Sequence, residues 1–172
     1  MRQAIEDGLR CNWQSLFNYA LRLSGSRDAA ADLVQSCAVK ALDSAATAPR
    51  PEAMRAWLFK ILRHLWIDGH RRDRTAQAAM PAEESLEIAG RYDDSIIAEI
   101  TVRQALEQLP HDHREIIALV DLAGFRYGEA ATILGVPQGT IMSRLSRARQ
   151  ALLAVIEREN LRPFEPRRRH AR

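Results

Sequence analysis

Residues 127–153 read YGEAATILGVPQGTIMSRLSRARQALL, and this stretch decides the fold of the region around it. Apolar residues recur at helical spacing up to Leu134, where Gly135-Val136-Pro137 interrupts the pattern. Glycine accepts the positive φ that ends many helices, and proline fits the first turn of the next helix because no N–H is needed there. The stretch therefore predicts two helices joined by a tight turn, with the second helix beginning near Gln138.

The second of these helices is predicted to have two chemically different sides. At about 100° per residue, its apolar residues share one side: Ile141, Leu145, Ala148 and Leu152. The opposite side has small, hydroxyl, amide and guanidinium groups, with further polar residues at its margins: Gly139, Ser143, Ser146, Arg147 and Gln150, then Thr140, Arg144 and Arg149.

A recognition helix in the DNA major groove needs this combination. Small residues allow close approach, and arginines bind guanine edges and phosphates. An ordinary amphipathic surface helix would share some of these features. The Gly-Val-Pro turn and the absence of acidic residues from Gln138 to Val155 favour a DNA-binding helix-turn-helix.

The charge is distributed unevenly along the chain. The net charge is +4 over residues 1–74, −4 over 75–95, −1 over 96–160 and +4 over 161–172, which makes +3 for the whole chain. Separated basic regions fit a nucleic-acid partner better than a membrane. No stretch approaches the roughly 20 apolar residues of a membrane span, and Met1 to Leu16 lacks the apolar run of a signal peptide. We therefore expect a cytoplasmic protein with no membrane partner.

The cysteines and histidines do not predict a cofactor or metal site. Cys11 and Cys37 lie far apart without CxxC spacing, so both are expected to be reduced thiols. The pairs His64/His70 and His111/His113 have no partner cysteine or carboxylate at metal-ligand spacing. No nucleophile elbow or phosphate loop is present, so we expect no catalytic residues, no cofactor and no small-molecule substrate.

The rest of the chain also has helical periodicity, and no strand alternation is found. Ser26 or Asp28 can cap a second helix, and Asp112 can cap a later one. The predicted helices before the helix-turn-helix are residues 13–23, 29–44, 52–72, 95–109 and 111–123. We therefore predict an all-α fold.

The helix predicted at 52–72 contains AWLFKILRHLWID, the most aromatic segment of the chain. A core helix explains its apolar residues, including Trp57. It does not readily explain the narrow basic stripe beside them, which Ile67 interrupts: Lys60, Arg63, His64 and Arg71, extended by Arg72 and Arg74.

The change of composition after this helix divides the chain. Residues 75–95 are acidic, contain a proline and have weak periodicity, so they are predicted to be a flexible linker. Residues 161–172 contain two prolines and Arg167-Arg168-Arg169, and are predicted to be a disordered basic tail. The chain should thus form two small helical domains, 1–74 and 96–160, the second with the helix-turn-helix.

Four segments together resemble the extracytoplasmic-function (ECF) sigma factors of bacterial RNA polymerase, in the order found in that family. They are ALRLSGSRDAAADLVQSCAVKAL, MRAWLFKILRHLWIDGHRR, ALEQLPHDHREIIALV and YGEAATILGVPQGTIMSRLSRARQAL. They make up about half the chain. The resemblance implies a specificity subunit that lends promoter recognition to the polymerase and is not itself an enzyme.

The resemblance also implies roles for particular residues. The DLVQ helix is expected to dock on the coiled coil of the largest polymerase subunit through Asp32, Leu33, Val34 and Gln35. The aromatic helix is expected to hold the melted −10 promoter strand through Lys60, Arg63, His64, Trp66 and Arg71. The helix-turn-helix is expected to read the −35 element through Tyr127, Thr140, Ser143, Arg144 and Arg147. An anti-sigma protein is a further expected partner.

The sequence departs from the family pattern at several of these places. Met142 stands where many relatives have a basic residue, and His64 stands where asparagine is common. Ser36 and Ala38 replace the acid and the phenylalanine that often follow DLVQ. Met142 bears on one DNA contact of the recognition helix, and His64 bears on discrimination within the −10 element. Ser36 and Ala38 bear on the strength of polymerase binding.

Two other classes of protein remain open from the sequence. A conventional regulator could bind duplex DNA as a dimer through the same helix-turn-helix, and an adaptor could use its helical bundles only to bind proteins. The front domain argues against the regulator, because a sensor or dimerisation domain has no reason to combine DLVQ with WLFKILRHLWID. The predicted recognition helix argues against the adaptor.

Overall fold

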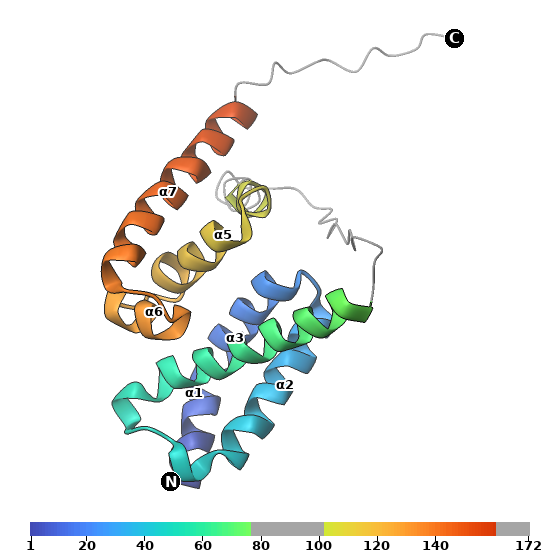
Figure 1. The fold of residues 1–172 in the computed structure, drawn as a ribbon, viewed down its shortest axis with the longest axis vertical. Coiled ribbons are helices and arrows are strands. Elements are labelled where there is room, and N and C mark those ends of the chain that lie inside the picture. Colours follow the sequence, from blue (N-terminus) through green and yellow to red (C-terminus); the bar gives the residue numbers. More distant parts are fainter. Residues whose placement is uncertain (77–101, 161–172) are drawn as a thin grey trace, which may run out of the picture.

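The computed structural model describes residues 1–76 and 102–160, and every regular element within these residues is a helix (Figure 1). The first group contains α1 (Arg2–Ser24), α2 (Arg27–Asp43), the short 3-10 turn η1 (Ala45–Thr47) and α3 (Pro51–Ala76). The second contains helical residues 102–107, α5 (His111–Ile117), the π-helical turn η2 (Ala118–Leu122), α6 (Tyr127–Leu134) and α7 (Gln138–Asn160). The predicted all-α, two-domain fold with a helix-turn-helix is confirmed.

The ends of the helices follow local chemistry. Gly25 ends α1 in the left-handed region, with φ 73°, and its N–H donates to the Leu21 carbonyl at 2.8 Å. The Ser26 side chain then accepts a hydrogen bond from the Ala29 N–H and caps α2, so Ser26 rather than Asp28 is the cap. Gly135 has φ 68° and ends α6 as predicted.

The first helix begins much earlier than predicted, at Arg2 instead of residue 13. Ile5 and Leu9, one helical turn apart, are buried and anchor the added turns. Between them, Gly8 lies so close to α3 that an added Cβ would be 2.6 Å from the Met54 Cγ. A glycine there permits the close packing, although it weakens the helical signal in the sequence.

The predicted cap of the helix after Pro110 is wrong, and the end of this helix departs from regular α-helix. Asp112 is not its cap: α5 begins at His111, with Pro110 at the N-cap position and no side-chain cap. Leu122 is not in the core, since it is 50% exposed. The chain makes a π-helical turn there, with the Ala123 N–H donating to the Ala118 carbonyl, and this wider turn carries Leu122 away from the buried face.

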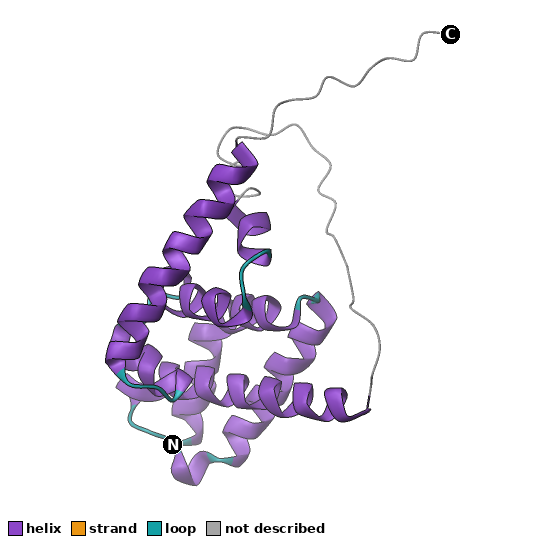
Figure 2. Ribbon diagram, turned by 45° about the horizontal axis from the view of Figure 1, so that its top comes forward, coloured by secondary structure: helices purple, strands orange, loops and turns teal. Residues whose placement is uncertain are grey.

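The two groups of helices share one continuous apolar core. Phe59 of α3 lies between Tyr19 of α1 and Phe125, with ring centroids 5.2 and 4.7 Å apart respectively. Arg55 donates a hydrogen bond to the Ala123 carbonyl and lies over the Phe125 ring, 4.1 Å from its centroid. In Figure 2 the long α7 runs along one side of the other helices and extends past them.

Several predictions lie outside the described residues. They are residues 77–95 of the predicted linker, the first part of the helix predicted at 95–109, and the tail at 161–172. The first two residues of the predicted linker, 75 and 76, are instead the end of α3. The side chains of Arg72 and Arg74 are also outside them. Among the helices that are described, none has the length and apolar content needed to cross a membrane.

Candidate polymerase and nucleic-acid interfaces

The face of α7 predicted to read DNA is open, and the opposite side of the helix is buried. Ile141, Leu145 and Ala148 are at most 2% exposed. Ser143 and Arg147 are exposed on the other side, and Thr140 and Arg144 are half-buried at its margins. The Ser143 hydroxyl donates to the Thr140 carbonyl at 3.1 Å. The helix therefore presents hydroxyl and guanidinium groups on a firmly packed base.

The helix before it is held by its own N-terminal contacts. The Glu129 carboxylate accepts a hydrogen bond from the Arg126 N–H at 2.8 Å, which caps the first turn of α6. Tyr127, the first residue of α6, is half-buried and lines a shallow groove beside α7. The other residues of this groove are Met142, Leu145, Ser146, Arg149 and Gln150.

An ion pair that the sequence did not indicate holds one side of this groove. Asp121, from η2, accepts hydrogen bonds from Arg149 Nε at 3.1 Å and from Arg149 Nη2 at 2.5 Å. The hydrogen bonds that Arg149 donates to Asp121 raise the pKa of its guanidinium above its usual value. This two-point contact fixes the direction of a cation at the margin of the predicted DNA-reading face.

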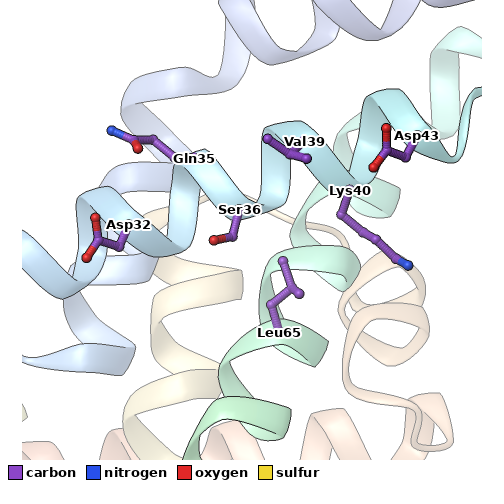
Figure 3. Close-up of a pocket in the computed structure, with 7 residues that line it drawn as sticks. All are labelled: Asp32, Gln35, Ser36, Val39, Lys40, Asp43 and Leu65. Carbon is purple, nitrogen blue, oxygen red and sulfur yellow. The ribbon is translucent and has the colours of Figure 1, made fainter.

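The predicted polymerase-binding residues of α2 are only partly available to a partner. Asp32 and Gln35 are exposed and line one groove with residues of α2 and with Leu65 of α3 (Figure 3). Leu33 is half-buried. Val34 is fully buried, so its side chain packs α2 onto the core and cannot contact a partner directly. Val39, 61% exposed in the same groove, is an apolar surface residue that the sequence did not single out.

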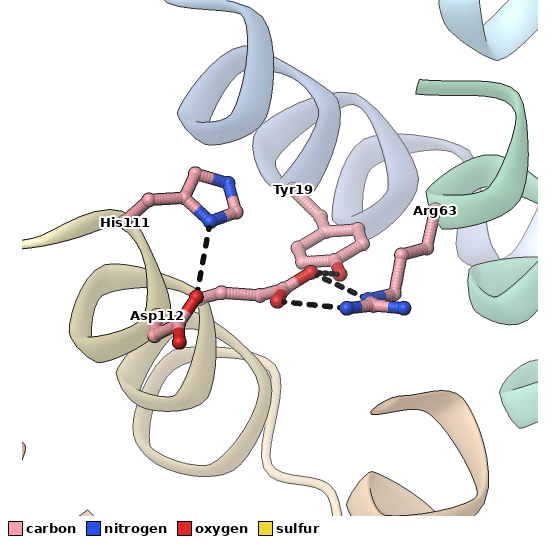
Figure 4. Close-up of polar contacts among 5 residues, drawn as sticks. Tyr19, Arg63, His111 and Asp112 are labelled. Atoms are coloured by element: carbon pink, nitrogen blue, oxygen red, sulfur yellow. Dashed lines mark hydrogen bonds and ion pairs between the residues drawn. The ribbon is translucent and has the colours of Figure 1, made fainter. Parts of the chain in front are cut away.

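The predicted −10 residues of α3 separate into two sets. His64 and Arg71 are exposed and Lys60 is half-buried. Arg63 and Trp66 are instead engaged by α5. Arg63 Nε donates to Glu115 Oε1 at 2.8 Å, and Arg63 Nη2 lies 3.4 Å from Glu115 Oε2 (Figure 4).

Glu115 is the centre of this contact and is only 5% exposed. The Tyr19 hydroxyl donates to Glu115 Oε1 at 3.0 Å, so one buried carboxylate binds groups from both α1 and α3. Burial, and then the negative charge of Glu115, raise the pKa of Tyr19 well above its ordinary value, so Tyr19 stays a neutral donor.

Trp66 stacks on two histidine rings. The His111 ring lies parallel to it, with centroids 4.6 Å apart and an interplanar angle of 2°. The His70 ring lies 4.9 Å away at 22°. We call the contact between the two groups the domain seam; it consists of Arg55, Phe59, Arg63 and Trp66 of α3 with His111, Glu115, Ala123 and Phe125.

The described histidines, cysteines and carboxylates nowhere come together in a group of three that could hold a metal ion. One histidine of each pair singled out in the sequence has a different contact: His70 and His111 both stack on Trp66. Cys11 is exposed and Cys37 is buried, and both are free thiols.

Two family profiles match the chain, one for each group of helices. The family profile for sigma-70 region 2 matches residues 2–76, and the profile for sigma-70 region 4 matches residues 99–152. The chain is 33% identical to the ECF RNA polymerase sigma factor EcfG of Rhodopseudomonas palustris, over 96% of this chain and 92% of that one. It is also 33% identical to SigC of Mycobacterium tuberculosis, over 92% and 86%.

A solved structure has a similar fold. The sigma factor RpoE of Bartonella quintana, in complex with the anti-sigma factor NepR, superposes with a TM-score of 0.75 at 33% identity, covering 88% of this chain and 96% of that one. A promoter-recognition subunit of the sigma-70 type is thus the class that the fold defines. Within it, the chain belongs to the ECF sigma factors, which are non-catalytic specificity subunits of RNA polymerase.

Proposed function

We propose that this sigma factor uses three separate surfaces: α2 for core polymerase, α3 for the melted −10 strand and α7 for the −35 duplex. The observation that carries the proposal is the open face of α7, where Ser143 and Arg147 are exposed above a buried apolar side. The corresponding domains are residues 1–74 and 96–160, joined by the acidic linker 75–95 and followed by the basic tail 161–172.

For the −35 element, Arg147 is the residue we assign to base recognition. Its guanidinium is exposed, as a bidentate contact with a guanine edge requires. Ser143 and Thr140 supply small polar groups beside it, and Arg144 and Tyr127 lie at the margins, where phosphates pass. Met142 is exposed and uncharged, so this sigma factor has one cation fewer on that face than many relatives.

For the −10 element, the exposed His64 and Arg71 and the half-buried Lys60 form the accessible part of the strand-binding surface. Cationic side chains hold the backbone of a displaced strand, and an aromatic ring such as that of Trp66 stacks an unpaired base. Arg63 belongs to the same stripe. His64, in place of the common asparagine, is the residue we expect to alter discrimination within this element.

For core polymerase, we assign the exposed Asp32 and Gln35 to the coiled coil of the largest subunit. A carboxylate and an amide three residues apart share one helix face and can bind arginines of a partner helix. Asp32→Asn should weaken assembly with core polymerase while leaving the fold intact. Asp7→Asn, which neutralises an exposed carboxylate on α1, is the matched control. Equal affinity of both variants in a titration against core enzyme would contradict the assignment.

We also propose an anti-sigma protein as a partner, because the similar RpoE was solved in complex with NepR. Such a partner would act in the cytoplasm and release the sigma factor to transcribe a stress- or signal-responsive set of genes. Pull-down of the tagged chain from its own cells, followed by a test of whether the captured protein blocks transcription in vitro, would identify it.

The first experiment is in vitro transcription with bacterial core polymerase on a fragmented genomic library, with and without this protein. Promoter-specific starts that depend on the protein are expected, and their alignment would yield both elements. If no such starts appear while the protein alone protects duplex DNA, a conventional helix-turn-helix regulator becomes the better description.

A further inference from the structure

A shallow groove lies along one edge of the proposed DNA-reading face. It is lined by Tyr127 of α6 and, on α7, by Met142, Leu145, Ser146, Arg149 and Gln150. Met142, Ser146 and Gln150 are spaced four residues apart and are all exposed, so they follow one line along α7. Ser146 is directly followed by Arg147, the residue assigned to base recognition. The groove therefore continues the face that the proposed function assigns to the −35 element.

Met142 is placed where a recognition helix contacts bases. Because α7 begins at Gln138, Met142 lies just after its first turn, and the N-terminal part of a recognition helix is the part that reaches base edges. Met142 and Arg147 are five residues apart, or about 140° around the helix, so they flank Ser143 from two sides. Met142 is 55% exposed and has apolar surface that a partner could bury. The two residues can thus contact different base pairs of one element.

The groove has little positive charge to offer a base. Among the described residues that line it, only Arg149 is charged. Asp121 binds both Nε and Nη2 of Arg149, which uses one donor fork of the guanidinium and offsets its positive charge. A guanine presents two acceptors, O6 and N7, in the major groove, and the Asp121 carboxylate would repel both. The groove is therefore a poor site for guanine.

The groove residues suit a thymine instead. Among the four bases, only thymine has an apolar group, the C5-methyl, on its major-groove edge. A methionine side chain is flexible and polarisable, so it can pack against such a group without a fixed geometry. Leu145, which is 2% exposed, supplies an apolar floor beside Met142. The Ser146 hydroxyl can donate to the thymine O4.

We propose that Met142 is a specificity-determining residue of this sigma factor and contacts the C5-methyl of one thymine in the −35 element. Arg147 then binds a guanine at one side of the reading face, and Met142 binds the thymine at the other. Asp121 is a positioning residue, because by holding Arg149 it keeps a guanidinium away from that thymine. The proposal rests on the assignment of α7 to the −35 element.

The first test removes the methyl group from the DNA. The sigma factor is assembled with core polymerase, and its binding to a promoter read from the mapped transcription starts is measured by competition with unlabelled duplexes. In these duplexes each thymine of the −35 element, on either strand, is replaced in turn by deoxyuridine, which lacks only the methyl group. One replacement should weaken wild-type binding about fourfold, the typical contribution of one buried methyl group. In Met142→Ala the same replacement should have no effect.

Matched variants make this test specific to Met142. Leu153 is 56% exposed on the same helix and does not line the groove, so Leu153→Ala should retain the fourfold effect. Met142→Leu keeps an apolar side chain of similar size and should retain most of it. The proposal is overturned if the mapped element contains no thymine on either strand, if no thymine is sensitive, or if the loss persists in Met142→Ala.

A second measurement tests the positioning role of Asp121. The sensitive thymine is changed to guanine, with its partner base, and the ratio of the affinities for the two duplexes is measured. Asp121→Asn should reduce the preference for thymine about fivefold, because the released Arg149 can donate to the guanine acceptors. Glu107→Gln, which removes an exposed carboxylate outside the groove, should leave the ratio unchanged. An unchanged ratio in Asp121→Asn would overturn this role.

Failure of the inference differs from failure of the proposed function. If Arg147→Ala loses selectivity for the cognate −35 sequence but no thymine is sensitive to loss of its methyl group, α7 reads the element without Met142. If neither Arg147→Ala nor scrambling of the −35 sequence changes binding, the assignment of α7 fails, and the role of Met142 fails with it.

Discussion

The face of α7 and the basic stripe of α3 contain similar side chains, yet they stand in different surroundings. On α7, Arg147 and Ser143 are exposed beside small neighbours. On α3, Arg63 lies against the buried Glu115 and Trp66 lies against a histidine ring. The difference shows that contacts within the chain, and not only residue type, decide which cations and aromatic rings of a helix are available to a partner.

The largest expected contrast between covered and open positions concerns the two thiols. Burial raises the pKa of Cys37 to about 12, and its Sγ lies 3.4 Å from the Leu58 carbonyl. An ordinary exposed thiol has a pKa near 8.5, so at pH 8 the thiolate fraction of Cys37 is lower by roughly a thousandfold or more. Cys11 should react with a thiol reagent within minutes and Cys37 only after unfolding, as mass spectrometry of labelled peptides would show.

The same pKa shift predicts how stability depends on pH. Because the folded protein holds the Cys37 proton more tightly than the unfolded chain does, this contribution is complete below about pH 8.5 and is lost as the pH rises towards 12. Urea denaturation at pH 8 and pH 10, compared between the wild type and Cys37→Ala, would measure it. A smaller loss in Cys37→Ala is expected, and equal losses would contradict this cause.

The next prediction compares the stability effects of substitutions on the buried and the exposed side of α7. Leu145→Ala removes a side chain that is 2% exposed and should lower the free energy of unfolding by about 2–5 kcal/mol. Met142→Ala, at a position that is 55% exposed, should change it by less than about 0.5 kcal/mol. Similar losses in the two variants, measured by chemical denaturation, would mean that α7 is not packed as the structure has it.

A smaller effect is expected at the proposed base contact. Arg147→Ala should weaken binding to the cognate −35 duplex by about 1–3 kcal/mol and binding to a scrambled duplex by much less. Arg147→Lys keeps the charge but loses the bidentate geometry, so it should lose specificity as well. Equal losses on both duplexes in a fluorescence-anisotropy titration would show that Arg147 only touches phosphate.

The smallest effect is expected at the ion pair beside that face. The Asp121 and Arg149 side chains are 30% and 53% exposed, so Asp121→Asn should cost only about 0.2–1 kcal/mol of stability. The released Arg149 should then bind duplex DNA less selectively. An effect above about 2 kcal/mol in thermal denaturation would indicate that the pair organises η2 rather than only orienting Arg149.

A feature of the fold could be predicted from the sequence when its physical cause lay in the residue itself or in its sequence neighbours. Gly25, Gly124 and Gly135 all have positive φ and stand where helix ends were predicted, because the steric freedom of glycine is a property of the residue itself. The early start of α1 was missed because the burial of Ile5 and Leu9 depends on other helices. The π-helical turn that exposes Leu122 was missed because no local signal announced it.

The amino-acid sequence by itself determined the helices, the helix-turn-helix and the family, since periodicity, turn residues and motifs are all carried by neighbouring positions. Only the tertiary structure decided which residues of each motif are exposed and available to a binding partner. Val34 is buried, Arg63 is bound by a carboxylate 52 positions away, and Arg149 is held by Asp121 28 positions away. Contacts at such separations depend on how helices pack, which a local pattern of residues does not specify.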